Sequence, residues 1–295
     1  MFAPEVCQGS QFARARQVRI DVRPYAELVL APRDRYADYV VDDVVGHGGS
    51  ATVYRAHHVA SADRAVALKV LDDRHHDQAH LDRLHREFEF ANELAHPHVV
   101  TVYECGPDWL AMELIGGGAV GGLTERSDVL AALGHIADAL DHAHSKGVVH
   151  CDVKPANILL AEDFAVGGAI LIDFGVARSL TEGVGRHRTH VEASLPYTPP
   201  EVLRGHPPAP AADEYALACT AVELLTGAPP FTSYTAMALV DDQLNRPVPR
   251  YSRRIDWVPR AFDSILAKAM AKDPDIRYGS CAEFVALLTR ALTVN

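Results

Sequence analysis

The sequence predicts an α+β protein with two lobes, a small β-rich lobe followed by a larger, mostly helical lobe. Three observations support this prediction. Runs of β-branched residues separated by glycines dominate the chain from Tyr39 to Leu71, as expected for short strands. A glycine-rich tract at 116–122 marks a change in the pattern and is interpreted as a hinge between the lobes. Beyond it, apolar residues recur mostly at helical spacing.

The small lobe is predicted to contain a series of strands and one main helix. The expected strands are 39–45, 52–56, 65–71, 99–103 and 109–113. The helix is expected at 80–95, because Leu81, Leu84, Phe88 and Ala91 fall on one stripe. His96-Pro97 follows and is expected to end it.

The larger lobe is predicted to be helical, with two short strands at 158–160 and 170–172. Its expected helices are 127–145, 211–225, 234–244, 261–271 and 281–292. Residues 1–37 are interpreted as an irregular or regulatory N-terminal extension, although 18–31 could add a strand or pack locally.

The composition excludes several classes of protein. The chain has 295 residues, with 28 Lys and Arg against 39 Asp and Glu, a net charge of −11. Non-specific nucleic-acid binding is therefore not expected, because it needs a basic face. No apolar run is long enough to span a membrane, and the N-terminus lacks signal-peptide features. The 5 Cys form no CxxC pair, which favours reduced thiols in a cytoplasmic protein over a disulfide framework or zinc site.

The first motif with chemical potential is the glycine-rich segment GHGGSATVYRA, residues 46–56, between two predicted strands. Glycines let backbone N–H groups approach phosphate oxygens closely. Taken alone the signal is weak, because glycines are common in turns between strands. No Lys follows as it does in the GxxxxGK[ST] phosphate loop.

The second motif is VALK, which places Lys69 inside an apolar strand. A buried ammonium needs a partner, and either a phosphate or a carboxylate would serve. A lysine extending from an edge strand into solvent is the alternative. The carboxylate candidates are Glu87, Glu89 and Glu93 on the following helix, and periodicity alone does not choose among them.

The third motif, HCDVKPAN at 150–157, places several polar groups on one tight loop. Asp152 could accept a hydroxyl proton and orient a nucleophile, while the amide oxygen of Asn157 could bind a metal. Lys154 could offset charge on a transferring phosphoryl group. A simple polar turn after a helix would not require this set.

The fourth motif is Asp173-Phe174-Gly175, which follows the apolar strand 170–172. An aspartate at the end of a buried strand is costly unless it binds a cation or accepts hydrogen bonds. Mg²⁺, which prefers oxygen ligands, is a natural partner.

In this order, these motifs resemble those of the protein kinase family, and VKPANILL and GGSATVYRAHH resemble most its bacterial eukaryotic-like Ser/Thr members. The resemblance covers about 38–293 and implies a bilobal protein-kinase fold. Its N-lobe, 38–115, would hold a small antiparallel sheet with one main helix, and its mostly helical C-lobe would span 116–293. PPE at 199–201, DEY at 213–215, ELLTGAPPF and KDPDIRYGS extend the match.

The resemblance assigns roles residue by residue. It implies that Lys69 holds the α- and β-phosphates of ATP and pairs with Glu87, that Asp152 is the catalytic base, and that Lys154 contacts the γ-phosphate. Asn157 and Asp173 would bind Mg²⁺ or Mn²⁺. Arg277 would pair with Glu201 as a structural ion pair.

The resemblance also implies a nucleotide-binding set. Met112 would be the gatekeeper, the backbone of Glu113 and Ile115 would bond the adenine edge, and apolar side chains would sandwich the ring. The full set expected to contact the nucleotide is Val45, Gly46, His47, Gly48, Gly49, Ser50, Ala51, Val53, Ala67, Lys69, Met112, Glu113, Ile115 and Leu159.

The chain departs from the family pattern at several positions. Ala51 replaces the third glycine of the loop and is expected to tune it without inactivating the protein. Cys151 replaces the Arg that in the family binds an activation-loop phosphate, so control by loop phosphorylation through this contact is not expected. Ala193 and Pro199 stand where the family has Gly and Ala.

Residues 178–194 correspond to the activation loop. Thr181 and Thr189 are candidate phosphosites, whereas Ser194 matches a residue that contacts the catalytic Asp and Lys. Arg186, His187 and Arg188 would either dock a phosphate or be solvated.

The sequence therefore predicts an active Ser/Thr protein kinase that uses ATP and Mg²⁺ on protein substrates. It would also phosphorylate itself, with a homodimer as one route to trans-autophosphorylation. The alternatives are a pseudokinase that binds nucleotide or partners without transfer, and a small-molecule phosphotransferase.

Overall fold

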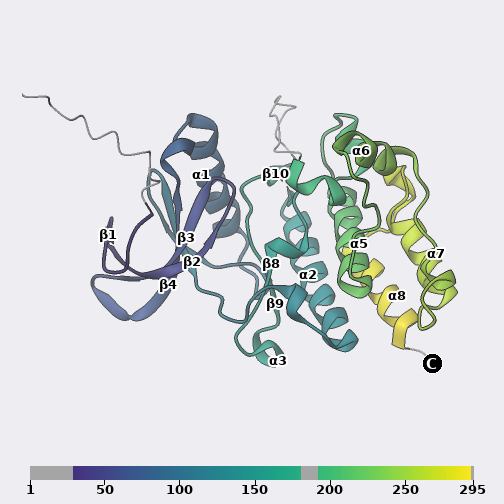
Figure 1. The fold of residues 1–295 in the computed structure, drawn as a ribbon, viewed down its shortest axis with the longest axis horizontal. Helices are drawn as coiled ribbons and strands as arrows, with labels where there is room; N and C mark the ends of the chain where they lie inside the picture. The colour runs from purple at the N-terminus through teal and green to yellow at the C-terminus, as the bar shows by residue number, and fades with distance from the viewer. Residues whose placement is uncertain (1–28, 181–191, 294–295) are drawn as a thin grey trace, which may run out of the picture.

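The computed structural model describes residues 29–180 and 192–293, which form two lobes. The N-terminal lobe is one antiparallel sheet with strand order β1-β2-β3-β4-β6-β5, and helix α1 packs on it (Figure 1). Its strands are β1 (Arg35–Tyr36), β2 (Tyr39–His47), β3 (Ala51–His58), β4 (Ser61–Leu71), β5 (Val102–Cys105) and β6 (Trp109–Glu113). The bilobal kinase fold predicted from the sequence is confirmed.

Strand β4 divides its side chains between the two faces of the sheet. Val66, Leu68 and Val70 enter an apolar cluster on one face, while Ala67 and Leu71 join the main core on the other. Because side chains alternate along a strand, Lys69 shares the face of Ala67 and Leu71. The pairing of β4 with β3 and β6 therefore carries the lysine to the side of the sheet that covers the active site.

Helix α1 (Gln78–Glu93) begins two residues before the predicted start, because the carboxylate of Asp77 accepts hydrogen bonds from the N–H groups of Ala79 and His80. Its buried face contains Leu84, Glu87, Phe90 and Ala91. The predicted stripe is confirmed, because Leu84 and Ala91 are buried in the main core and Leu81 and Phe88 are half-buried against it. Glu87 is the charged member of an otherwise apolar face.

The predicted strand at 99–103 is wrong at its start. Strand β5 begins at Val102. The preceding residues instead join the C-lobe, because Val100 donates its N–H to Leu171 O (3.0 Å) and Leu171 donates its N–H to His98 O (2.9 Å). This segment therefore links the two lobes through backbone hydrogen bonds.

The glycine-rich tract predicted as a hinge is an irregular connection between the lobes. Gly117 donates its N–H to Leu160 O (2.9 Å), and Leu160 donates its N–H to Gly118 O (2.8 Å). A Cβ at Gly117 would collide with the backbone oxygens of Leu160 and Ala161. The close approach of two backbones explains the glycine here.

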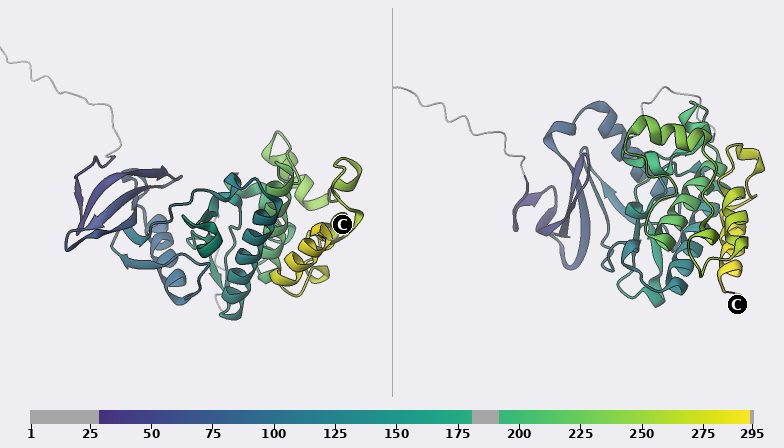
Figure 2. Two further views of the ribbon diagram at one scale, coloured as in Figure 1. Left: turned by 90° about the horizontal axis from the view of Figure 1, so that it is seen from below. Right: turned by 45° about the vertical axis from the view of Figure 1, so that its right-hand side comes forward.

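The C-terminal lobe is built mainly of helices packed around α5, which is almost completely buried along its first three turns. The other buried residues of α5 are mostly apolar, and the buried carboxylates of Asp213 and Glu214 accept backbone hydrogen bonds. The helices are α2 (Arg126–Ser145), α3 (Phe164–Gly167), α4 (Pro200–Leu203), α5 (Pro210–Thr226), α6 (Ala236–Asn245), α7 (Arg260–Ala269) and α8 (Cys281–Thr293). Helix α2 contacts both α5 and α8, and α7 and α8 lie at the end of the molecule farthest from the sheet (Figure 2).

Two short antiparallel strand pairs lie between the helices and the N-lobe. They are β8 (Ile158–Leu160) with β9 (Ala169–Leu171), and β7 (Val148–Val149) with β10 (Arg178–Ser179). The loops that carry Asp152 and Asp173 leave these pairs, so the pairs fix where those carboxylates lie.

Part of the predicted extension belongs to the sheet. Strand β1 pairs with β2, and Tyr36 donates its hydroxyl hydrogen to Asp108 (2.7 Å), so ordered structure begins before residue 38. Residues 1–28 lie outside the described part, as do Thr181, Arg186, His187, Arg188 and Thr189. In the described part, no helix has the length and apolar character needed to cross a membrane.

Candidate active site

A cavity of about 1090 Å³ lies between the lobes. All the side chains predicted for nucleotide binding, metal binding and catalysis line it. From the N-lobe and linker these are Val45, Gly46, His47, Gly48, Gly49, Ser50, Ala51, Val53, Ala67, Lys69, Glu87, Met112, Glu113 and Ile115, and from the C-lobe Asp152, Lys154, Asn157, Leu159 and Asp173. Residues separated by more than a hundred positions in sequence thus face one space.

Lys69 is paired with Glu87 across the N-lobe. Its Nζ lies 2.8 Å from Oε1 and 2.6 Å from Oε2 of Glu87, and 3.8 Å from Oδ1 of Asp173. Burial alone would lower the pKa of Lys69, but the carboxylates of Asp173 and Glu87 outweigh it and raise that pKa. The ammonium therefore stays charged and is available to a phosphate. Of the three glutamates left open by periodicity, the structure selects Glu87.

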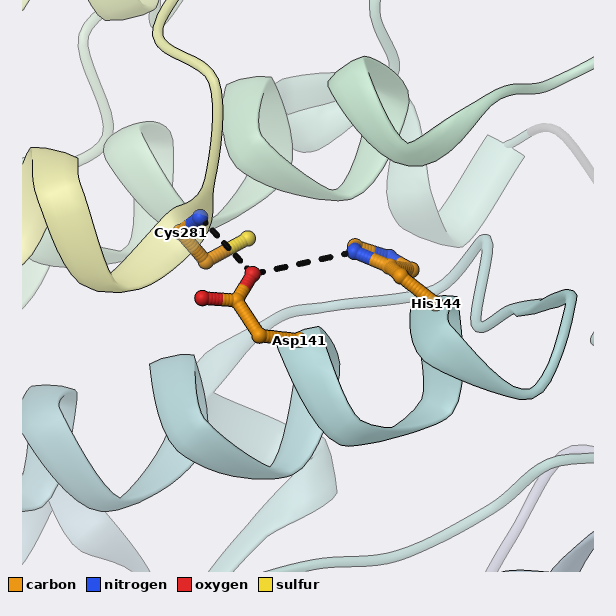
Figure 3. Close-up of side chains that lie close together, drawn as sticks. All are labelled: Asp141, His144 and Cys281. Atoms are coloured by element: carbon orange, nitrogen blue, oxygen red, sulfur yellow. Dashed lines mark hydrogen bonds and ion pairs between the residues drawn. The ribbon is translucent and has the colours of Figure 1, made fainter.

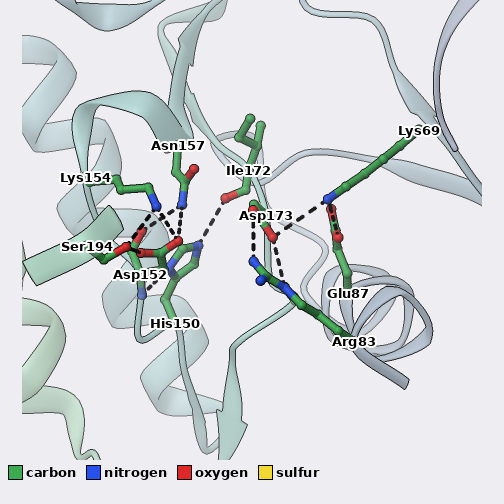
Figure 4. Close-up of polar contacts among 11 residues, drawn as sticks. Lys69, Arg83, Glu87, His150, Asp152, Lys154, Asn157, Ile172, Asp173 and Ser194 are labelled. Carbon is green, nitrogen blue, oxygen red and sulfur yellow. Dashed lines mark hydrogen bonds and ion pairs between the residues drawn. The ribbon is translucent and has the colours of Figure 1, made fainter. Parts of the chain in front are cut away.

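Arg83 is a site residue that the sequence prediction missed. Its Nη2 lies 3.5 Å from Oδ2 of Asp173, while Lys69 approaches Oδ1 of the same carboxylate (Figure 4). The sequence could have indicated this residue, because Arg83 precedes Glu87 by four positions and residues four apart share a helix face. Burial of the Asp173 carboxyl opposes ionisation, yet Lys69 and Arg83 together hold its pKa below the usual range. Asp173 is therefore an anion ready to bind a cation.

The catalytic loop gathers its polar groups around Asp152 (Figure 4). Lys154 Nζ donates to Oδ2 of Asp152 (2.8 Å) and to Oγ of Ser194 (3.0 Å), and Ser194 Oγ donates to Oδ1 of Asp152 (2.5 Å). Ser194 thus contacts both Asp152 and Lys154, as expected. Each carboxylate oxygen is held from a separate direction, so the orientation of Asp152 is fixed.

Asn157 is oriented by the same carboxylate. Its Nδ2 donates to the backbone oxygen (2.8 Å) and to Oδ2 (3.0 Å) of Asp152. The amide nitrogen is therefore occupied, which leaves Oδ1 available as a ligand. Together with the ionised Asp173, this provides the oxygen donors that Mg²⁺ or Mn²⁺ prefers, so the residues present fit a divalent cation.

Asp213 of α5 holds the backbone of the catalytic loop. This fully buried carboxylate accepts the backbone N–H of His150 and of Cys151 (2.8 Å each) and a hydrogen bond from Nε2 of His144 (2.8 Å). The anchoring supports a left-handed backbone at Cys151, where φ is 68°. A non-glycine residue adopts this conformation only where its surroundings impose it.

His150 joins the catalytic loop to the segment that carries Asp173. Its Nδ1 accepts the N–H of Asp152 (3.2 Å), so Nε2 carries the hydrogen and donates to Ile172 O (3.2 Å). Its ring also contacts Phe174 edge to face at 4.7 Å. The sequence prediction gave His150 no role, and only the folded loop shows it as a positioning residue.

The nucleotide end of the cavity is apolar. Val53, Ala67 and Leu159 line it together with the buried side chain of Met112. The N–H of Glu113 donates to Thr101 O (2.8 Å), so a hydrogen bond from Glu113 to adenine would have to use its carbonyl oxygen.

The alanine in the glycine-rich segment is accommodated without strain. Ala51 is the first residue of β3, is buried and has no positive φ, so its Cβ fits the backbone conformation.

The chain is similar to known proteins in both sequence and structure. Residues 39–287 match the sequence model of the protein kinase domain. The chain belongs to this family. Among curated relatives from Mycobacterium tuberculosis, Serine/threonine-protein kinase PknJ is 38% identical over 272 residues and PknH is 34% identical over 269 residues. These alignments cover 87% and 88% of the chain but 46% and 42% of the relatives, so the chain spans less than half their length.

Solved structures show the same fold. The kinase domain of M. tuberculosis PknI superimposes with a TM-score of 0.69 at 30% sequence identity, covering 90% of this chain and all of that domain. The kinase relatives therefore support the fold class and the order of the elements around the cleft.

Proposed function

We propose that this chain is a Ser/Thr protein kinase that transfers the γ-phosphate of ATP to hydroxyl groups of protein substrates, with Mg²⁺ or Mn²⁺ as the metal. The observation that carries the proposal is the convergence of Lys69, Glu87, Asp152, Asn157 and Asp173 on one cleft, with the Lys69–Glu87 ion pair formed. The names of the relatives, all Serine/threonine-protein kinases, support it.

Each group has a defined task in this mechanism. Lys69, held by Glu87, neutralises the α- and β-phosphates, while Asp152 orients the substrate hydroxyl and accepts its proton. Lys154 lies 2.8 Å from Asp152, where it can offset charge on the transferring phosphoryl group. Asn157 and Asp173 would hold the metal, which when bound neutralises phosphate charge. Transfer of this kind depends mainly on positioning and electrostatics.

The proposal includes the class of substrate and the setting. Lys154, two positions after Asp152, favours Ser and Thr over Tyr by resemblance to the family. The expected partners are proteins with Ser or Thr acceptors. A second copy of this chain is one such partner, since a homodimer would allow trans-autophosphorylation. A cytoplasmic location with ATP as the co-substrate belongs to the same proposal.

The departures from the family pattern do not favour the pseudokinase alternative. Ala51 is accommodated as a strand residue, and Cys151 keeps the backbone hydrogen bond to Asp213 that holds the loop. Lys69, Glu87, Asp152, Asn157 and Asp173 all line the cleft, which supports transfer over nucleotide binding alone.

The test is phosphate transfer from labelled ATP with Mg²⁺ to the protein itself and to a generic basic protein substrate. The Asp152→Asn variant is expected to lose activity by about 10²- to 10⁴-fold, the usual contribution of a general base. Asp82→Asn, an exposed change on α1, serves as the matched control and is expected to leave transfer unchanged. If wild-type protein binds MgATP but transfers no phosphate, the pseudokinase reading replaces this proposal.

A further inference from the structure

Three different metal-ligating side chains meet in the C-lobe outside the catalytic cleft. Asp141 and His144 lie three residues apart on α2, and Cys281 is the first residue of α8 (Figure 3). One ligand atom from each, a carboxylate oxygen, a ring nitrogen and the sulfur, lies within 4.8 Å of the others. None of the three lines the cavity between the lobes.

Asp141 is fixed by the start of α8. Its Oδ1 accepts the N–H of Cys281 (2.9 Å) and its Oδ2 accepts the N–H of Ala282 (3.0 Å). Each carboxylate oxygen can accept more than one interaction, so these bonds leave lone pairs for a cation. The same contacts hold Cys281 next to the carboxylate, so two of the three ligands are positioned before any ion binds.

His144 is oriented by a carboxylate on its far side. Its Nε2 lies 2.8 Å from Oδ2 of Asp213, which can only accept, so Nε2 carries the hydrogen. Nδ1 is 3.9 Å from Oδ1 of Asp141, too far for a hydrogen bond. A histidine that donates one N–H to a carboxylate and presents its other nitrogen is the arrangement that supports metal-bound histidines in proteins.

Cys281 supplies a soft ligand from a buried position. Its residue surface is only 1% exposed, and burial, with Asp141 nearby, raises the pKa of its thiol. The sulfur is therefore a protonated thiol when no ion is present. On binding, the S–H bond breaks, the proton passes to solvent, the sulfur–metal bond forms and water leaves the hydrated ion. No oxidant or reductant is needed.

We propose that Asp141, His144 and Cys281 form a Zn²⁺-binding site between α2 and α8. Zn²⁺ accepts carboxylate, imidazole and thiolate ligands together, whereas Mg²⁺ and Ca²⁺ prefer oxygen alone. Three protein ligands leave a fourth position for water, and the side chain of Asp141, 25% exposed, gives access to solvent.

The site is coupled to the catalytic loop through one side chain. His144 holds Asp213, and Asp213 holds the backbone N–H groups of His150 and Cys151. A metal on the other nitrogen of His144 would fix the ring and so stabilise this anchor. Binding is therefore expected to raise the melting temperature of the whole domain.

The experiment measures Zn²⁺ affinity by competition with a chromogenic chelator and follows Co²⁺ binding by its thiolate charge-transfer absorption. Wild-type protein is expected to bind both ions and to melt at higher temperature with Zn²⁺. Cys281→Ser, which keeps the side-chain shape but replaces the sulfur, is expected to lose the cobalt band and at least about tenfold in Zn²⁺ affinity. Cys281→Ala gives a second variant, and melting without metal verifies that both are folded.

Cys151→Ala is the matched control, because Cys151 is a thiol that lines the catalytic cleft near other possible ligands. It is expected to keep the cobalt band. The proposal is overturned if the band persists in folded Cys281→Ser, if it disappears only in Cys151→Ala, or if wild-type protein shows no Zn²⁺ binding. The last result would leave the three residues as a helix-capping cluster only.

Discussion

At the scale of single residues, position 151 distinguishes this chain from the family pattern. The backbone of Cys151 is held by Asp213 and its thiol donates to Val149 O (3.4 Å), so the loop keeps its shape without the arginine. Burial and the neighbouring carboxylate of Asp213 raise the pKa of the thiol, which leaves it neutral. A neutral group cannot bind a phosphate as the arginine does, while the geometry around Asp152 is preserved.

The expected consequence is activity that does not depend on loop phosphorylation through this contact. The double variant Thr181→Ala/Thr189→Ala is expected to transfer phosphate at a rate within about threefold of wild type. This is a smaller change than the tenfold that about 1.4 kcal/mol in activation free energy would produce. Initial rates on a protein substrate, with phosphorylation state checked by mass spectrometry, measure this. Cys151→Arg, made with and without the two threonines, restores the cation as a comparison. Complete loss of activity in the double variant would contradict the prediction.

A second residue-scale prediction concerns Glu214 on α5. Burial raises the pKa of its carboxyl to about 7, although the N–H of Tyr278 donates to it (3.0 Å). Because the folded pKa lies above the unfolded value, the carboxyl contributes most stability below about pH 4.5, and this contribution is lost as the pH rises through about 7.

Glu214→Gln, which stays neutral and keeps the acceptor oxygen, is therefore expected to lose less stability on raising the pH. Between about pH 5 and pH 8 the melting temperature of wild type should fall by a few degrees more than that of the variant. Thermal melts at both pH values measure the difference. The exposed Glu93→Gln should behave as wild type, and equal pH dependence in Glu214→Gln would disprove the assignment.

At the scale of secondary-structure elements, one ion pair joins α4 and α5 to the segment before α8. Arg277 donates from Nη1 and Nη2 to the two carboxylate oxygens of Glu201 (2.7 Å each), and also to the backbone oxygens of Ala211 and Ala271. The pairing inferred from resemblance is confirmed. The guanidinium side chain is fully buried, so every donor must find a protein acceptor.

Removing one partner is expected to cost more than removing a surface pair. Glu201→Ala leaves a buried, uncompensated guanidinium and should lower the free energy of unfolding by about 3–5 kcal/mol. Denaturant unfolding measures this loss. Arg246→Ala, which removes the exposed partner of the pair with Asp242, should cost about 1 kcal/mol or less. Similar losses in the two variants would contradict the role given to burial.

At the scale of the whole molecule, the lobes are held in register by two sets of backbone contacts. Residues 98–100 bond to β9, and Gly117 and Gly118 bond to Leu160 at the end of β8. Strands β8 and β9 pair with each other, so both connections meet on one small ribbon. The spacing between Lys69 and Asp173 therefore depends on how closely the linker approaches that ribbon.

Gly117→Ala tests this dependence. The added Cβ would meet two backbone oxygens, so the linker must move, and the cost is expected to be about 1–3 kcal/mol of stability. Weaker ATP binding should accompany it. Gly121→Ala is the control, because a Cβ there meets nothing within 4 Å. Unchanged nucleotide affinity in a folded Gly117→Ala would show that the linker does not set the cleft.

The sequence by itself determined the fold class, most elements and the chemistry of the cleft. Alternation along 65–71 and helical spacing in the second half are local patterns, so they predicted strands and helices to within a few residues. The motifs around Lys69, Asp152 and Asp173 are visible in the sequence in their order, and the resemblance that this order supports supplied the role of each residue. These features can be predicted from the sequence because each depends on residues that are close together along the chain.

Resemblance predicted a few contacts between distant groups, such as Lys69 with Glu87 and Arg277 with Glu201, but only the tertiary structure decided the others. Periodicity could not choose Glu87 over Glu89 and could not pair Arg83 with Asp173. It also began the strand that starts at Val102 too early, because residues 98–100 bond to Leu171 of β9 instead. The cysteine spacing gave no zinc motif, yet packing of α2 on α8 brings Cys281 beside Asp141 and His144. Long-range contacts depend on how whole elements pack, and that information is spread over the entire chain.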